Sequence, residues 1–231
     1  MSSNSKKLCA VEIENIKPVG IGDNVCLTML FNFDKGCSLL AGSFNRALFL
    51  TSGYSDKVDA GCISTYTLCD DDKTKYLGDL RRGDELLTVN FAGRGLSNEI
   101  TQIKTEKRQM LLINANYTLS GRNIFELLKS HGENYFNGYR SIFRLQDTLT
   151  GKPISVLDIP RYMNRENDIC AFLKVGTAFT DSENNLITRV DGTQKSASKL
   201  NLGDRILAYV QMPGIQSRHF GMAYDGLCIE R

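Results

Sequence analysis

The sequence predicts a mainly β protein of the α+β class, built from β-roll or barrel-like units with Gly-Asp turns and one or two short helices. One pattern, apolar-x-x-Gly-Asp-x-apolar-apolar, occurs as "LRRGDELL" at 80–87, as "LNLGDRIL" at 200–207 and more weakly as "VGIGDNVC" at 19–26. Glycine permits positive φ and aspartate accepts bonds from nearby backbone amides, so each copy indicates a tight turn that begins a strand. The segments between the copies mostly have the residue pattern of strands, and strands do not alternate with helices as they do in βαβ units.

The strand candidates are short apolar or β-branched runs bounded by polar residues. The runs "AFLKVGTAFTD" and "LITRV" flank "SENN", which is typical of a hairpin. Besides this hairpin, we expect strands at 38–42, 47–53 and 62–69, a long strand or a hairpin at 99–119, and a final strand at about 220–229.

One helix is predicted at 120–132, where apolar residues recur at helical spacing. Ser120 or Asn123 is a suitable cap for its start, and Gly132 suits its end. A second short helix is predicted in "VLDIPRYMNREN", with Pro160 in its first turn.

The composition is that of an ordinary soluble globule, with 42% hydrophobic and 23% charged residues. A net charge of +2 gives no reason to expect nucleic acid or an anionic membrane as a partner. No run approaches the ~18 apolar residues of a membrane span, and the first residues show no secretory signal. The seven cysteines are an odd number and mostly sit in apolar runs. We therefore expect a cytoplasmic protein without disulfides, in which at least four of the seven thiols are mostly buried.

The clearest candidate for chemistry is the alternating row Lys104, Glu106 and Arg108. In a strand these three side chains project from one face. A cation–carboxylate–cation row can grip a phosphate or carboxylate, or orient a base. The alternative is a solvated strand face with cross-strand pairs. The sequence holds none of the P-loop, HExxH, GxSxG, Rossmann or zinc-ligand motifs.

A second candidate is the pair Arg218 and His219, which follows a loop at the start of the expected final strand. Histidine transfers protons near neutral pH and arginine holds an anion by two-point contact. The alternative is a histidine that is hydrogen-bonded at a strand start. His131, the other histidine, is expected to stabilise the C-terminal end of the helix.

Three further residues, Tyr66, Lys75 and Tyr76, bracket an acidic turn. They suit a site near a sheet edge, and packing within a hairpin explains them equally well. The aspartates at 70–72 in the turn are oxygen ligands suited to a hard cation, whereas consecutive aspartates in a turn usually face water.

Several segments occur in the order found in the 3-dehydroquinate synthase II family, which the sequence resembles. They are "VGIGDNVCLTML", "GCSLLAGS…ALFLTS", "AGCISTYTL…KTKYLGDLRRGDELLTV", "IKTEKRQMLLINA" and "LNLGDRILAYV…RHFGM…IER". The similarity covers most of 19–119 and 170–231. It implies a single β-rich domain over 1–231 that resembles the C-terminal part of the family, with an insertion at 120–168.

The resemblance implies a chemistry. Members close an open-chain C7 amino-keto acid, or its phosphorylated relative, to a six-membered carbocycle by an intramolecular aldol step. One branch uses NAD and gives 3-dehydroquinate. The other, the 3-amino-4-hydroxybenzoate synthases, is metal-dependent and lyase-like, and serves aromatic biosynthesis in secondary metabolism. Such steps need a base, a carbonyl polariser and an anion clamp.

The sequence also departs from the family pattern. Ser64 stands where the family has a histidine, and Gly53 lies near the position of a family glutamate. The segment "LKVGTAF" replaces a Gln-Asn-Ala-Glu segment, and only about 20 residues precede the "GDNVC" segment at 22–26.

We therefore expect a diverged cyclising synthase of this type in a biosynthetic pathway. The alternative is a non-catalytic accessory or scaffold homologue that binds a partner protein or a small molecule. The expected cofactor is Mn²⁺ or another divalent metal rather than NAD. The expected partners are a small phosphorylated or carboxylated substrate and either a second copy or a full-length paralogue. The resemblance implies His219 for proton transfer, Glu106 as base or metal ligand, Lys104 as carbonyl polariser, Tyr66 as a further catalytic residue, and Arg108, Arg218 and Lys75 for substrate binding.

Overall fold

The computed structural model describes residues 7–30, 38–43, 47–53, 56–70, 73–90, 94–132, 143–180 and 185–210. The chain separates into two compact units. Unit 1 comprises Met1–Ala115 with Val175–Arg231, and unit 2 comprises Asn116–Lys174. The fold is mainly β, as predicted.

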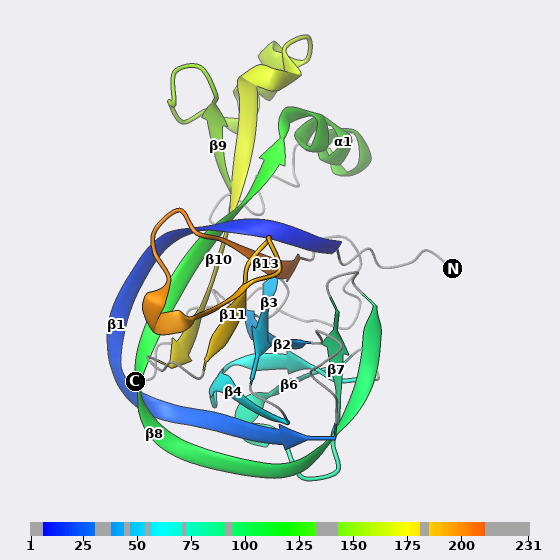
Figure 1. Cartoon of the computed structure of the whole chain (residues 1–231). Coiled ribbons are helices and arrows are strands. Elements are labelled where there is room, and N and C mark those ends of the chain that lie inside the picture. The colour runs from blue at the N-terminus through cyan, green and yellow to red at the C-terminus, as the bar shows by residue number, and fades with distance from the viewer. Residues whose placement is uncertain are drawn as a thin grey trace. The chain divides into compact units, whose positions relative to one another are not determined.

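Unit 1 is a large sheet whose neighbouring strands are mostly antiparallel. Two of its strands, β1 and β8, are far longer than the rest and curve around the outside of the unit (Figure 1). Strand β8 continues into unit 2. The strands are β1 (Lys7–Met29), β2 (Ser38–Ser43), β3 (Ala47–Ser52), β4 (Lys57–Cys62), β5 (Tyr66–Leu68), β6 (Thr74–Tyr76), β7 (Glu85–Val89), β8 (Gly95–Ser120), β11 (Leu186–Thr188), β12 (Gln194–Ser196) and β13 (Arg205–Val210), with 3-10 turns η2 (Leu77–Asp79) and η5 (Ala197–Lys199).

Six of these strands close into a ring in the order β3-β13-β1-β8-β7-β2, because β2 also pairs with β3. The β2–β3 register places Leu40 opposite Leu50, and both side chains are fully buried in the same apolar cluster. A second cluster gathers residues of β1, β4, β7 and β8 with η2, including Leu27, Val58 and Ile100. Burying such aliphatic side chains contributes roughly 1.5–3 kcal/mol each.

The ring contains an internal repeat with a constant offset of 120 positions. The N–H of Leu77 donates to the carbonyl of Thr65 over 2.8 Å, and the N–H of Ala197 donates to the carbonyl of Asn185 over 2.9 Å. The bridge between Cys69 and Leu86 likewise recurs between Arg189 and Ile206. The segments β5-β6-η2-β7 and β11-β12-η5-β13 are therefore equivalent.

Two of the three predicted Gly-Asp turns sit at the same place in this repeat. Gly83 and Gly203 have φ of +88° and +82°, a region that glycine adopts without steric cost. Asp84 and Asp204 directly precede β7 and β13, as expected. The third copy does not begin a strand, because Asp23 lies inside the uninterrupted strand β1.

Unit 2 contains one α-helix, α1 (Gly121–His131), strand β9 (Phe143–Asp147) and two 3-10 segments, η3 (Val156–Tyr162) and η4 (Glu166–Asp168). Strand β10 (Ile169–Thr180) pairs antiparallel with β9. The predicted caps of α1 are confirmed. The Ser120 hydroxyl accepts from the N–H of Asn123, and the N–H of Gly132 donates to the Leu128 carbonyl.

Several expected elements differ from the structure. The run at 62–69 is not one strand, because a turn follows β4 and strand β5 starts only at Tyr66. Among the described residues, β10 pairs with β8 and β9 and β11 pairs with β3 and β12, in place of the expected hairpin between β10 and β11. The second helix is a 3-10 helix with Pro160 in its interior. The expected strand at 220–229 lies outside the described residues.

The expected single domain over 1–231 remains a prediction. The segment predicted as an insertion, 120–168, falls within unit 2, and its being an insertion remains a prediction. The described cysteines form no disulfide: Cys62 and Cys69 are buried, while Cys9, Cys26 and Cys170 are half-buried.

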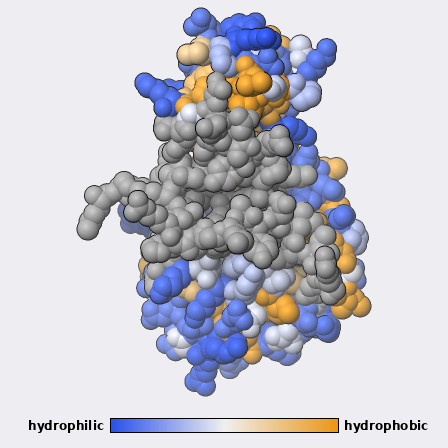
Figure 2. Space-filling view, turned by 180° about the vertical axis from the view of Figure 1, so that it is seen from behind, coloured by the Kyte–Doolittle hydropathy of each residue, from blue (hydrophilic) through white to orange (hydrophobic). Residues whose placement is uncertain are grey.

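The surface of unit 2 seen in Figure 2 carries a group of hydrophobic residues beside hydrophilic ones. Its most exposed large apolar side chains include Leu149, Leu157 and Met163. Within the described ranges, none of the helices has the length and apolar character needed to cross a membrane.

Candidate functional site

A cavity of about 390 Å³ lies in unit 1 between β1, β4 and β8. Its size falls within the range of small-molecule sites. The pocket contains the whole charged row that the sequence singled out in β8. It is lined by Cys26, Leu27, Thr28, Lys57, Val58, Asp59, Gln102, Ile103, Lys104, Glu106 and Arg108.

The charged row in β8 is a connected ion network. Glu106 forms a salt bridge with Lys104 through one carboxylate oxygen. Its other oxygen accepts from Arg108 Nη2 at 2.5 Å and from Nε at 3.1 Å, so the guanidinium binds it through two nitrogens. Alternation along a strand puts residues 104, 106 and 108 on one face, as predicted. Glu106 therefore holds two cations at the pocket wall.

The network shifts the titration of its members. Hydrogen bonds from Lys104 and then Arg108 lower the pKa of Glu106. The hydrogen bond to Glu106 in turn raises the pKa of Lys104 and of Arg108. Each charged form is thus favoured by its partner. At neutral pH the row presents two cations and one carboxylate, which makes Glu106 a weak base.

Strand β4 supplies a second set of charged groups. The β1–β4 register places Asp59 opposite Cys26 and Lys57 opposite Thr28. Asp59 is only 8% exposed, and its Oδ1 accepts from the Cys26 thiol at 3.0 Å. Burial, and then the hydrogen bond to Asp59, raises the pKa of Cys26 to about 12. The thiol therefore stays protonated and acts as a donor to the carboxylate.

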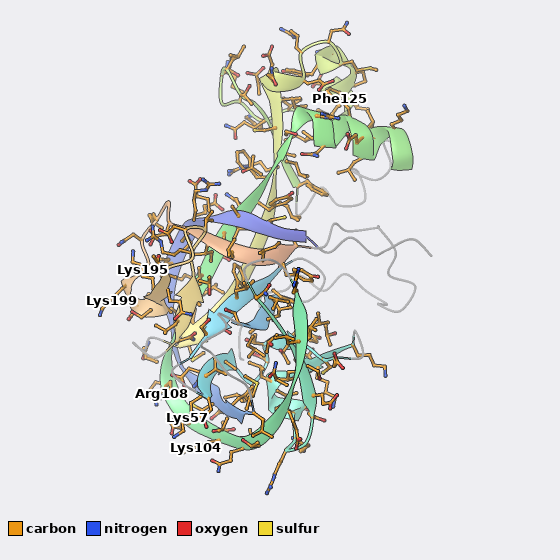
Figure 3. All side chains as sticks on the ribbon, turned by 45° about the vertical axis from the view of Figure 1, so that its right-hand side comes forward. Lys57, Lys104, Arg108, Phe125, Lys195 and Lys199 are labelled. Carbon is orange, nitrogen blue, oxygen red and sulfur yellow. The ribbon has the colours of Figure 1, made fainter. Side chains whose placement is uncertain are left out.

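Lys57 brings a third cation to the pocket. Its backbone belongs to β4, and its side chain is exposed. Within the part of the chain that the structure describes, no carboxylate pairs with it. Figure 3 shows Lys57, Lys104 and Arg108 gathered in one region of unit 1. An unpaired ammonium beside two held cations leaves the pocket able to accept an anion.

The internal repeat shows that this charge is not required by the fold. The N–H groups of Ile100 in β8 and Ile13 in β1 donate to the carbonyls of Asp84 and Asp204, so the two strands are equivalent with an offset of 87 positions. Counting along both strands from this anchor, Lys104 corresponds to Lys17, Glu106 to Val19 and Arg108 to Ile21.

Val19 and Ile21 are exposed apolar residues. Residues 17–21 of β1, called the twin strand below, correspond to 104–108 of β8. The twin strand thus folds without the carboxylate of Glu106 and the guanidinium of Arg108. A purely structural need for the Glu106–Arg108 pair would be expected at both places. The Glu106–Arg108 pair is therefore found in only one of the two equivalent strands.

Other candidates from the sequence lie elsewhere. Tyr66 stacks on Tyr76 with ring centroids 4.1 Å apart, and neither lines the pocket. Lys75 binds Asp84 at 2.8 Å, and the repeat has the same contact between Lys195 and Asp204 at 2.7 Å. Because the contact recurs in both halves, Lys75 serves the turn rather than the pocket.

The remaining candidates cannot be placed at the pocket. Arg218 and His219 lie outside the described residues, as do positions 71 and 72 of the acidic turn. The side chain of His131 lies outside them too. Ser64, at which the resemblance implies a histidine in other members, shares a 3.1 Å hydrogen bond with Cys62.

The described pocket residues do not fit a divalent metal ion. Both pocket carboxylates already have partners: Glu106 forms salt bridges with two cations, and Asp59 accepts a hydrogen bond from the Cys26 thiol. No group of three His, Cys, Asp or Glu residues able to hold a metal occurs among the described residues. Hard cations need several free oxygen ligands.

The sequence reasoning missed Lys57, Asp59 and Cys26. Lys57 and Asp59 alternate within "KVDAGC", which is a signal of one strand face. Their relation to the row in β8 depends on how β4 and β8 lie on either side of β1, and that pairing has no local signature.

The fold and the pocket together define a β-rich protein with a cation-lined pocket of about 390 Å³. Residues 10–132 match the 3-dehydroquinate synthase II C-terminal domain. The chain is similar to 3-dehydroquinate synthase of Methanococcus maripaludis, with 34% identity over 69% of this chain and 44% of the relative. It therefore belongs to the 3-dehydroquinate synthase II family.

Longer matches exist at lower identity. The 3-dehydroquinate synthase of Methanopyrus kandleri is 27% identical over 97% of this chain and 45% of its own length. The 3-dehydroquinate synthase homolog of Aquifex aeolicus is 26% identical over 97% of this chain and 54% of its own length. The chain thus spans about half the length of these curated relatives. No solved structure matches it.

Proposed function

We propose that the β1/β4/β8 pocket binds an open-chain C7 amino-keto acid or its phosphate, and that the chain is a synthase that closes this compound to a six-membered ring. The observation that carries the proposal is the gathering of Lys57, Lys104 and Arg108 around one cavity. The relatives named 3-dehydroquinate synthase supply the reaction class.

In this proposal the three cations have different roles. Arg108 presents a planar fork suited to a phosphate or carboxylate, and Lys57 adds an unpaired ammonium to the same anion. Lys104 is the ammonium left to polarise a carbonyl oxygen as negative charge develops there. Glu106 positions Lys104 and Arg108 through its two oxygens.

The proposal is tested by incubating the purified chain with an open-chain C7 amino-keto acid phosphate, alone, with Mn²⁺ and with NAD. The product is followed by mass spectrometry. We expect a cyclised product from the wild type and a rate at least ~10-fold lower from Arg108→Ala, since a charged hydrogen bond contributes about 1.5–3 kcal/mol. The matched control is Lys17→Ala in the twin strand, which should keep the wild-type rate. Absence of binding and of product under all three conditions would overturn the proposal.

A further inference from the structure

We propose that Glu106 determines the anion selectivity of this pocket, because its carboxylate occupies the gap between Lys104 and Arg108 and keeps inorganic phosphate out of it. The inference deepens the proposed function, on which it rests for the identity of the organic ligand. In this role Glu106 takes no proton and forms no covalent bond. It excludes small anions from a position that two cations would otherwise offer them.

The carboxylate of Glu106 stands where a free anion would bind. One of its oxygens pairs with Lys104, and the other accepts from Nε and Nη2 of Arg108. An ammonium and a guanidinium on either side of one acceptor group is the arrangement that binds phosphate or carboxylate. A dissolved anion can therefore enter this gap only by displacing Glu106 or by lying beside its negative charge.

Burial does not protect the gap from dissolved anions. The side chain of Lys104 is 73% exposed, and that of Glu106 is 25% exposed. The Arg108 side chain is 38% exposed. Anions in the solvent can approach all three groups, so the negative charge of Glu106 is what opposes their binding to the two cations.

An organic anion can bind beside Glu106 without displacing it. The guanidinium of Arg108 has five N–H donors in a planar fork, and its Nη1 makes no hydrogen bond with any residue that the structure describes. Nη1 and the second N–H of Nη2 form a further edge of this fork. Lys57 lines the same cavity and lies with Arg108 in one region of unit 1 (Figure 3).

The two kinds of anion therefore meet the pocket differently. The anionic group of a longer ligand binds the second edge of Arg108 and Lys57, while its carbonyl oxygen reaches Lys104. Inorganic phosphate has no carbonyl to place there and loses the position between Lys104 and Arg108 to Glu106. The internal carboxylate thus disfavours phosphate more than the organic ligand.

The twin strand shows that the fold tolerates an uncharged residue at this place. Val19 corresponds to Glu106 and Ile21 corresponds to Arg108. The carboxylate and the guanidinium are thus absent together, and a carboxylate that controls anions at Arg108 has no such role where the arginine is missing. Because Val19 occupies the equivalent place, we expect Glu106→Gln to fold.

The first test is calorimetric titration of the purified chain with inorganic phosphate, in a buffer without other multivalent anions. For Glu106→Gln we expect a Kd for phosphate roughly 5-fold lower than that of the wild type, the upper scale of one solvent-exposed charge interaction. A gain in affinity cannot arise from damage to the structure. The matched control is Glu12→Gln, which makes the same change in net charge at an exposed position of β1 and should leave the Kd unchanged.

A double variant places the gained phosphate. Glu106→Gln combined with Arg108→Ala should lose the gain in affinity, because phosphate then has only one side of the gap to bind. Retention of the gain in the double variant would mean that phosphate binds elsewhere, and would overturn the role of Glu106.

A second titration uses the C7 amino-keto acid phosphate. For this ligand we expect the Kd of Glu106→Gln to stay within about 2-fold of the wild type, since the lost repulsion is offset by the loss of the carboxylate that holds Lys104. A gain for phosphate below about 2-fold, or equal tightening of both ligands, would contradict the selectivity role. Absence of wild-type binding to the organic ligand would overturn the proposed function, whereas the phosphate titrations decide separately whether Glu106 excludes small anions.

Discussion

Asp84 and Asp204 stand 120 positions apart and hold equivalent turns in the same way. Asp84 accepts the N–H of Arg81 at 2.9 Å and binds Lys75, while Asp204 accepts the N–H of Asn201 at 2.8 Å and binds Lys195. Each aspartate thus ties a turn to the short strand that precedes it. Contacts that occur in both repeats, such as these, are explained by the fold. Residues found in only one repeat need another explanation.

Replacing either aspartate should destabilise the protein. Asp204→Asn and Asp84→Asn each weaken a charge-assisted bond to lysine and a bond to a backbone amide, so we expect a loss of about 1–3 kcal/mol in the free energy of unfolding. Urea denaturation followed by circular dichroism measures it. The exposed Glu12→Gln serves as control. A loss below about 0.5 kcal/mol for both variants would contradict the structural role of the turns.

The contribution of these aspartates should depend on pH. Burial raises the pKa of Asp204, but the hydrogen bonds from Lys195 and the Asn201 amide outweigh it and lower the pKa overall. A carboxyl with a lowered folded-state pKa stabilises above its unfolded pKa, about 3.9, and loses this contribution as pH falls through the folded value.

The difference in unfolding free energy between wild type and Asp204→Asn should therefore be full at pH 6 and shrink below about pH 4. Urea titrations of both proteins at several pH values measure this difference. If this difference in unfolding free energy grows as the pH falls, the lowered pKa of Asp204 is contradicted.

Cys26 should be unreactive in the folded protein. A pKa raised to about 12 leaves a thiolate fraction at neutral pH that is lower by a factor on the order of 10³ than that of an ordinary thiol. Peptide mass spectrometry after iodoacetamide treatment measures its labelling. Asp59→Asn removes the acceptor and its negative charge, so labelling should become faster. Rapid native-state labelling of Cys26 in the wild type would show that the Asp59–Cys26 contact is absent.

The binding of anions should distinguish the two halves of the ring. Lys57→Ala and Arg108→Ala are each expected to weaken binding of a C7 amino-keto acid phosphate by about 10- to 100-fold, the value of one charged hydrogen bond. Lys17→Ala and Lys195→Ala change cations outside the pocket and should leave the Kd unaffected. Equal losses for all four variants would mean that net charge, rather than this pocket, attracts the ligand.

Local patterns in the sequence were sufficient for the two Gly-Asp turns, the caps of α1 and the alternating row in β8. In each case the decisive interactions join residues close in sequence, such as Ser120 with Asn123 or Glu106 with Arg108. The prediction that the third Gly-Asp copy begins a strand was wrong. Asp23 lies inside β1, where the continuous pairing of a long strand overrides the local preference for a turn.

The pocket could not be assembled from local patterns. Lys57 and Asp59 meet the row of β8 only because separate strands converge there, and strand order is a long-range property. The break at 63–65 within the expected strand depends on a distant contact too, since the N–H of Ile63 donates to the Asp23 carbonyl. Lys75 was a candidate because it brackets the acidic turn with Tyr66 and Tyr76, and its salt bridge with Asp84 joins two segments that no local pattern pairs.

Titration of the ¹⁵N-labelled chain with an open-chain C7 amino-keto acid phosphate tests the central claim most directly. The account predicts saturable shifts concentrated in the amides of residues 26–28, 57–59 and 102–108, which line the pocket. It predicts unchanged amides around Lys17, Val19 and Ile21 in the twin strand. Shifts confined to residues 17–21 of β1 or to unit 2, or no shifts at millimolar ligand, would contradict the assignment of the β1/β4/β8 pocket as the substrate site.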